Sequence, residues 1–146
     1  MDSIDRRILA VLKENAATSA TEIGKTVNLS IPAVNKRIAR LKEKGVISST
    51  TIITNPKKVD KPVCAFILLV MQYGEMVENF LEHVMDDPDI LECYATTGEY
   101  DYLIKVFAPD VEALEEKLLL IKSQKGVVKS HTMLALAEHK FEATVL

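Results

Sequence analysis

The first fifteen residues place apolar side chains at the spacing of an amphipathic helix. The apolar positions are Ile4, Ile8, Leu9, Val11 and Leu12. Because they recur three or four residues apart, they form one apolar stripe on a helix whose remaining surface is polar. Asp2 or Ser3 can cap the start of this helix, and Asp5 suits the positive end of its dipole.

A second, shorter segment has the same periodicity. Ser19 is followed three residues later by Glu22, which is the capping-box pattern and predicts that a helix begins here. The helix should end near Val27, and Asn28 suits the turn that follows.

A third helix is predicted after this turn. Ser30 can cap it, and Pro32 lies in its first turn, where a missing N–H does no harm. Gly45 is expected to end it. The order of helix, short helix, tight turn and longer capped helix is typical of a helix-turn-helix motif.

The third helix has one apolar side, and the other side fits the major groove of DNA. Val34, Ile38 and Leu41 form the apolar stripe. On the outward side, Arg or Lys can read guanine and Asn can read adenine, while flanking side chains bind phosphates. The candidate DNA-binding residues are Thr21, Ser30, Pro32, Ala33, Asn35, Lys36, Arg37, Arg40 and Lys44. The alternative is a basic helix that faces only solvent.

The charge distribution favours the DNA-binding interpretation. The chain has 146 residues and a net charge of -3. Residues 1–61 contain 12 Lys/Arg and 6 Asp/Glu, whereas residues 62–146 contain 6 Lys/Arg and 15 Asp/Glu. Such asymmetry indicates two domains with different partners, and the basic domain suits a polyanion.

A linker is expected between the two halves. The segment "GVISSTTIITNPKKVDKP" contains two β-rich stretches, then Asn55-Pro56, which marks a turn. We interpret it as an extended tether with one strand from Val46 to Thr54. The predicted organisation is a DNA-binding domain at 1–47, a linker at 48–61 and a second domain at 62–146.

The second half has the periodicity of a ferredoxin-like βαββαβ unit, which makes the fold class α+β. Helices are predicted over 75–85 and from a cap at Asp110 to Gly126; strands are predicted over 63–72, 90–97, 102–108 and 128–139. This order predicts an antiparallel sheet of strand order 4-1-3-2, with two helices on one face.

The first predicted strand, "VCAFILLVM", is apolar throughout, as expected of a strand buried on both sides. Two helices cover only one side of the sheet, so the other side should pack against a second copy in an isologous dimer. Cys64 and Cys93 lie on strands separated by a third, about 10 Å apart, which is too far for a disulfide.

Other classes of protein fit the sequence less well. His83, His131 and His139 form no cluster, and no phosphate-binding glycine loop or metal-ligand spacing occurs, so we expect no enzyme, no metal site and no cofactor. No apolar run is long enough to span a bilayer, and the N-terminus lacks a signal-peptide pattern. We therefore expect a cytoplasmic protein.

The chain resembles the Lrp/AsnC (feast/famine) transcriptional regulators along nearly its whole length. The resemblance is carried by "DSIDRRILAVLKENA", "LSIPAVNKRIARLKEKGVI", "TTGEYDYLIKV" and "VVKSHTMLAL", in this order and spacing. It implies an N-terminal winged helix-turn-helix domain and a C-terminal effector-binding module. It also implies dimers that assemble into octamers, and transcriptional control tuned by amino acids.

The same resemblance places the recognition helix on Ser30 to Lys44 and a glycine-to-aspartate turn on Gly98 and Asp101. The family's pocket lies between subunits, near this turn and the last strand. The linker departs from the family's pattern, because it lacks the glycine often found before the sheet domain and has Asp60 in that region.

The chemistry of "TTGEYDY" fits an amino-acid effector. Free N–H groups near Gly98 could hold a carboxylate, and Glu99 or Asp101 could pair with an ammonium group. The candidate effector-binding residues are Thr96, Thr97, Gly98, Glu99, Tyr100, Asp101 and Thr132. The alternative is an ordinary hairpin turn in a regulator or DNA-organising protein that binds no effector.

Overall fold

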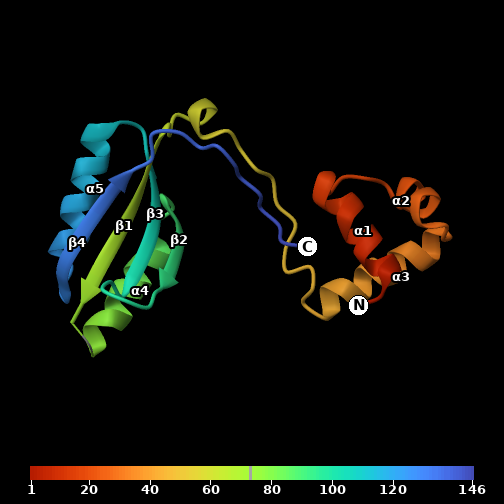
Figure 1. Ribbon diagram of the computed structural model, residues 1–146, viewed down its shortest axis with the longest axis horizontal. Helices are drawn as coiled ribbons and strands as arrows, with labels where there is room; N and C mark the ends of the chain where they lie inside the picture. The colour runs from red at the N-terminus through yellow and green to blue at the C-terminus, as the bar shows by residue number, and fades with distance from the viewer. Residues whose placement is uncertain (73) are drawn as a thin grey trace. The chain divides into compact units, whose positions relative to one another are not determined.

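The computed structural model describes residues 1–72 and 74–146. It divides the chain into two compact units. One unit comprises Met1–Ile53 together with Lys140–Leu146, and the other comprises Thr54–His139. Figure 1 labels the helices and strands of both units.

Three helices form the N-terminal unit, namely α1 (Ser3–Glu14), α2 (Ala20–Val27) and α3 (Ile31–Glu43). Each begins at a predicted cap, because the side chains of Asp2, Ser19 and Ser30 accept hydrogen bonds from main-chain N–H groups three residues further on. The capping box predicted at Ser19 is present. The predicted helix-turn-helix order is therefore confirmed.

The core of this unit brings the three helices into close contact. Its buried members are Ile8, Ile23, Val27 and Val34. Asn28 turns the chain between α2 and α3 in the left-handed conformation, with φ 58°. The turn passes so close to α2 that a Cβ on Gly24 would lie 2.6 Å from the carbonyl oxygen of Leu29. Only glycine fits at this position without displacing the main chain.

The second unit is a four-stranded antiparallel sheet with two helices. Its elements are β1 (Val63–Met71), α4 (Glu75–Asp86), β2 (Ile90–Ala95), β3 (Tyr102–Ala108), α5 (Val111–Ser123) and β4 (Val127–Leu134). The strands lie in the order β2-β3-β1-β4, and every neighbouring pair is antiparallel. This confirms the predicted ferredoxin-like fold, including the predicted strand order.

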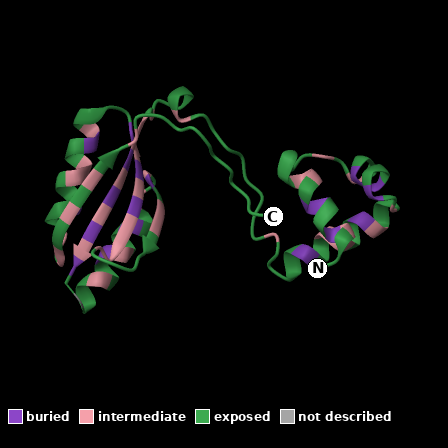
Figure 2. Ribbon diagram, in the orientation of Figure 1, coloured by how far each residue is buried: buried purple, intermediate pink, exposed green. Residues whose placement is uncertain are grey.

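The two helices cover one face of the sheet. Side chains from both helices join one cluster with alternate residues of the central strands; its buried members include Phe80, Val84, Leu114, Ile121, Ala65, Ile67, Leu69 and Met71. The intervening residues of β1 point to the other face and are half-buried: Cys64, Phe66, Leu68 and Val70. Figure 2 shows this alternation along β1.

The two cysteines lie on opposite faces of the sheet. Cys64 is paired in register with Phe107 on the open face, whereas Cys93 is paired with Ile104 and packs against the helix-side core. Both are free thiols. Burial raises the pKa of each thiol, so neither is activated as a thiolate.

Two sequence predictions of strands are wrong. The strand predicted at 46–54 is absent, since residues 48–55 contain no helix or strand. The sheet of the described residues comprises β1 to β4 alone, so this segment has no neighbouring strand with which to form hydrogen bonds. The predicted turn at Asn55-Pro56 is present as a short 3-10 helix, Pro56–Lys58.

The last strand ends at Leu134 instead of continuing to His139. Leu134 is paired in register with Ala65, and β1 begins only two residues before that, at Val63. After Leu134 the chain makes one more main-chain hydrogen bond to β1, from the Ala135 N–H to the Cys64 carbonyl. The end of β1 therefore limits the length of β4.

Candidate functional site

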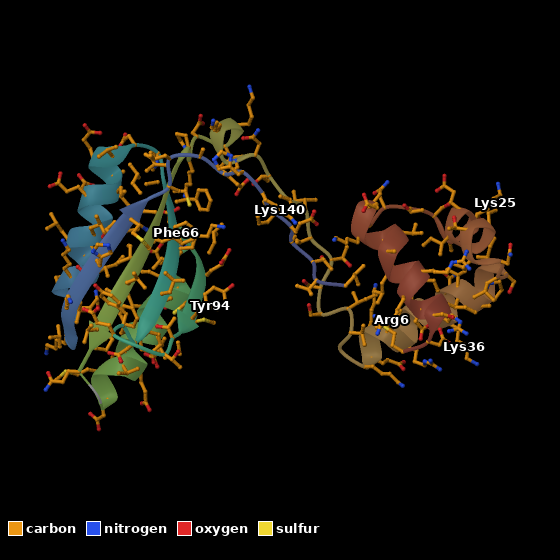
Figure 3. The ribbon with its side chains drawn as sticks, in the orientation of Figure 1. Arg6, Lys25, Lys36, Phe66, Tyr94 and Lys140 are labelled. Atoms are coloured by element: carbon orange, nitrogen blue, oxygen red, sulfur yellow. The ribbon has the colours of Figure 1, made fainter. Side chains whose placement is uncertain are left out.

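The outward face of α3 carries most of the predicted DNA-binding residues. Val34 and Leu41 are buried and Ile38 is half-buried, as the predicted stripe requires, so the rest of the helix surface faces outward. Exposed residues are Thr21, Ser30, Pro32, Asn35, Lys36, Arg40 and Lys44; Ala33 and Arg37 are half-buried. Lys36 is labelled in Figure 3, together with two further exposed cations of this unit, Lys25 and Arg6.

Arg37 differs from the other basic residues of α3, because acidic side chains of α1 bind it. Its Nη1 atom lies 2.7 Å from Asp2 Oδ2 and 2.7 Å from Asp5 Oδ1. Arg40 is further from the same group, with its Nη2 atom 3.5 Å from Asp5 Oδ2. The exposed fraction of the side chain is 26% for Arg37 and 53% for Arg40, so Arg40 is much more accessible to a ligand.

The ion pairs shift the pKa values of all three partners. The hydrogen bond from Arg37 is the main cause of a lowered pKa at Asp5. At Asp2, the main-chain N–H of Asp5 is the largest cause and Arg37 the next. The two carboxylates in turn raise the pKa of Arg37. All three groups are therefore held in their charged forms.

The burial of Asp5 against the basic residues of α3 is not evident from the sequence alone. The one signal is its position, since Asp5 directly follows the apolar Ile4 and lies three residues before Ile8, on the same side of the helix as the apolar stripe. The exposed Arg6 and Lys25 also add positive charge to this unit, although they lie on α1 and α2 instead of α3.

The second candidate site is a cavity between α4 and the β2–β3 hairpin. Its volume is about 440 Å³, and it is lined by Met71, Gly74, Val77, Glu78, Thr96, Asp101 and Tyr102. Thr96 and Asp101 are predicted effector residues that the fold brings together here. Glu78 and Val77 come from α4 and were not anticipated from the sequence.

Asp101 holds the hairpin against β1. Its Oδ2 atom accepts a hydrogen bond of 2.7 Å from the Met71 N–H, and its own N–H donates to the Leu69 carbonyl at 2.8 Å. The Thr96 hydroxyl donates to the Tyr100 carbonyl across the turn at 2.7 Å. Gly98 has φ 102°, a conformation that favours glycine. These contacts give the hairpin the structural role expected of an ordinary turn, which is the alternative to an effector-binding turn.

Glu99 and Tyr100 reach toward β4 instead of the cavity. Lys129 Nζ lies 2.6 Å from Glu99 Oε1 and 5.2 Å from the centre of the Tyr100 ring, which also lies 6.3 Å from the His131 ring. The hydrogen bond from Lys129 lowers the pKa of Glu99, and Glu99 raises the pKa of Lys129. A carboxylate with this partner is less available for an ammonium ligand.

The remaining predicted effector residues lie away from the cavity. Thr97 is exposed in the hairpin. Thr132 is paired in register with Ile67, four residues along β1 from Met71, so the fold does not bring it to the cavity within one chain.

Two further features of the described residues bear on other classes of protein. Outside position 73, the chain has no group of three or more His, Cys, Asp or Glu side chains able to hold a metal ion. Among the helices of the described part, none combines the length and apolar character needed to cross a membrane.

Comparisons with known proteins match both units. Residues 1–48 match a winged helix-turn-helix DNA-binding model, and residues 64–145 match the Lrp/AsnC ligand binding domain. The HTH-type transcriptional regulator FL11 of Pyrococcus furiosus is 34% identical over 140 residues, covering 96% of this chain and 92% of that protein. The transcriptional activator DecR of Escherichia coli is 28% identical, covering 99% of this chain and 97% of that protein.

Solved structures agree with these matches over the full chain. A transcriptional regulator of Neisseria meningitidis, in complex with L-Met, has a TM-score of 0.96 and 29% identity, covering 100% of this chain and 96% of the other. Escherichia coli AsnC has a TM-score of 0.90 and 26% identity, covering 99% and 97%. The resemblance noted in the sequence is thereby confirmed, and the chain belongs to the Lrp/AsnC family of transcriptional regulators.

Proposed function

We propose that this regulator binds specific DNA sequences through the outward face of α3, and that an amino acid tunes its DNA affinity or its assembly. The observation that carries the DNA-binding part is the exposed polar and basic face of α3 beside its buried apolar stripe. Pro32 and Ala33 allow close approach to the groove, while Asn35, Lys36 and Arg40 read base edges. Thr21, Ser30 and Lys44 bind phosphates.

The cavity beside the hairpin supports the amino-acid part of the proposal. Met71 and Val77 offer apolar contacts, and Glu78 offers a carboxylate for an ammonium group. The second carboxylate oxygen of Asp101 is the other candidate, since Oδ2 already accepts the Met71 N–H. The complex of the similar Neisseria meningitidis regulator with L-Met makes an apolar amino acid the first ligand to test.

We further propose that two chains pair through the open face of the sheet. This face presents Phe66, Leu68 and Leu103, which stay half-buried in a single chain. Phe66 is labelled in Figure 3. Covering them in an isologous dimer would present two copies of α3 to half-sites about one helical turn apart, near 34 Å, or a multiple of it. Such dimers could assemble further, up to an octamer of four dimers.

In this proposal residues 1–47 bind DNA, 48–61 act as a tether, and 62–146 bind the effector and form the assembly. An amino acid can change DNA binding only if it binds one arrangement of subunits more tightly than another. A regulator that binds no effector is the alternative, favoured by the structural roles of Asp101 and Glu99 in a single chain.

A mobility-shift titration tests the two possibilities. The duplex is one selected from a random-sequence library by the wild-type chain, and L-methionine and other single amino acids are added in parallel while light scattering follows the assembly. A change in affinity or assembly with one amino acid supports the effector role. Selective binding that no amino acid alters supports the effector-free alternative.

A further inference from the structure

Asp5 is the one charged or polar residue among the buried side chains of the described residues, with 1% of its surface exposed. A buried carboxylate is stable only when charged or polar groups satisfy it. Asp5 lies at the third position of α1, where its Oδ2 atom accepts a hydrogen bond of 3.3 Å from the Asp2 N–H. The other partners of this carboxylate come from α3.

The carboxylates of Asp2 and Asp5 together have partners at all four oxygen atoms. Asp2 Oδ1 accepts from the Asp5 N–H at 2.8 Å, and Asp2 Oδ2 accepts from Arg37 at 2.7 Å. Asp5 Oδ1 also accepts from Arg37 at 2.7 Å, while Asp5 Oδ2 accepts from the Asp2 N–H and lies near Arg40. The capping box of α1 is thus also an ion-pair site for α3, which we call the Arg37 clamp (Asp2, Asp5 and Arg37).

The clamp adds directional hydrogen bonds to the apolar packing between α1 and α3. Ile8 and Val34 belong to one buried apolar cluster, whose stabilisation follows mainly from the apolar area removed from water and has no directional hydrogen bonds. Two charge-assisted hydrogen bonds at one guanidinium nitrogen have a defined geometry, and they are short, at 2.7 Å. They therefore fix the orientation of α3 on α1.

We propose that Arg37 is a positioning residue for DNA recognition rather than a DNA contact. It holds α3 in the orientation from which Lys36 and Arg40 read the groove. Its positive charge is already paired with two carboxylates, so it has little attraction for phosphate. This inference rests on the proposed DNA-reading role of α3, and it reassigns Arg37 within the set predicted from the sequence.

Replacing each Asp with the isosteric Asn distinguishes positioning from direct DNA contact, because the two roles predict opposite changes in affinity for the selected duplex. If Arg37 binds DNA, Asp5→Asn removes a competitor and a negative charge near the phosphates, so affinity should rise or stay constant. If the clamp positions α3, Asp5→Asn should lower affinity for the selected duplex by about tenfold. Asp2→Asn should act in the same direction, and Asn caps a helix as well as Asp does.

The experiment measures the affinity of the untagged chain for the selected duplex and for a random-sequence duplex of the same length. Lys36→Gln is the matched control, since Lys36 is the exposed neighbour of Arg37 on the same helix. Circular dichroism checks that each variant keeps its helices. If Asp5→Asn does not fold, the direction of the affinity change in Asp2→Asn decides between the two roles.

The clamp predicts that both Asp→Asn variants lose affinity for the selected duplex, while their affinity for the random duplex stays at the wild-type level or rises. It also predicts that the double variant, Asp5→Asn with Arg37→Gln, loses little more DNA affinity than Arg37→Gln alone, because substitutions of two residues that interact directly are not additive. Unchanged or tighter binding by folded Asp→Asn variants overturns the clamp. Wild-type binding by Lys36→Gln would instead contradict the proposed role of Lys36 in reading DNA.

Discussion

The carboxylate of Asp101 accepts a hydrogen bond from the main-chain N–H of Met71 at 2.7 Å, which joins the β2–β3 hairpin to the end of β1. The same residue lines the candidate effector cavity. One side chain therefore has a structural role in the single chain and a proposed role toward a ligand, and two substitutions test the structural role.

Asp101→Ala should destabilise the second unit by about 1–3 kcal/mol, because the Met71 N–H is left without its partner. Asp101→Asn keeps an oxygen acceptor and should cost much less. All four tyrosines lie in this half of the sequence, between positions 73 and 102, so tyrosine fluorescence during urea unfolding follows this unit. Equal stability of the alanine variant and the wild type would contradict the structural role.

Gly24→Ala should destabilise the N-terminal unit by about 1–3 kcal/mol, the usual cost of overpacking. The added Cβ would lie 2.6 Å from a main-chain carbonyl, that of Leu29, which cannot turn away as a side chain could. Far-UV circular dichroism during heating measures the loss. Lys25→Ala, at the exposed next position of the same helix, is the control and should melt like the wild type.

The Arg37 clamp should make the N-terminal unit sensitive to acid. The pKa values of Asp2 and Asp5 are lowered from the ordinary 3.8, so the folded chain holds these protons less tightly than the unfolded chain does. Their stabilisation is present above the unfolded value and is lost as the pH falls through the folded values. As the pH falls from about 5 through 3.8 and below, the melting temperature of the wild type should therefore fall more steeply than that of Asp2→Asn.

Glu22 also has a lowered pKa, through its hydrogen bonds with Ser19, but this capping box is unchanged in Asp2→Asn. It contributes the same acid sensitivity to both proteins and cancels in the comparison. Parallel pH profiles for the two proteins would show that the ion pairs of Asp2 contribute nothing to folding.

Phe66→Asp should dissociate the proposed dimer, since it places a charge in the centre of the open face of the sheet. Light scattering should then give the mass of a single chain. Met85→Asp is the matched control, because Met85 is 83% exposed on α4, on the helix side of the sheet. A dimer that survives Phe66→Asp would rule out pairing through this face.

The sequence predicted the local features well because they depend on neighbouring residues. Caps at Ser19, Ser30 and Asp110 and the turn at Asn28 lie where expected. The strand order was also predictable, because a βαββαβ chain has few alternatives once the connections are fixed.

Features that depend on distant partners were not predictable in this way. The strand expected at 46–54 has the right residues but no neighbour, and β4 stops where β1 stops. The pairing of Arg37 with Asp5, 32 residues apart, depends on how α1 and α3 cross. The distance of Thr132 from the hairpin depends on the register between β1 and β4.

The most direct test of the central claim is the affinity of the wild type, Lys36→Ala and Arg40→Ala for the selected duplex, measured at one salt concentration. If α3 reads DNA, each substitution should weaken specific binding by about 1–3 kcal/mol, roughly five- to 150-fold, while the helices melt as in the wild type. Wild-type affinity in both variants would contradict the assignment of α3 as the DNA-reading helix.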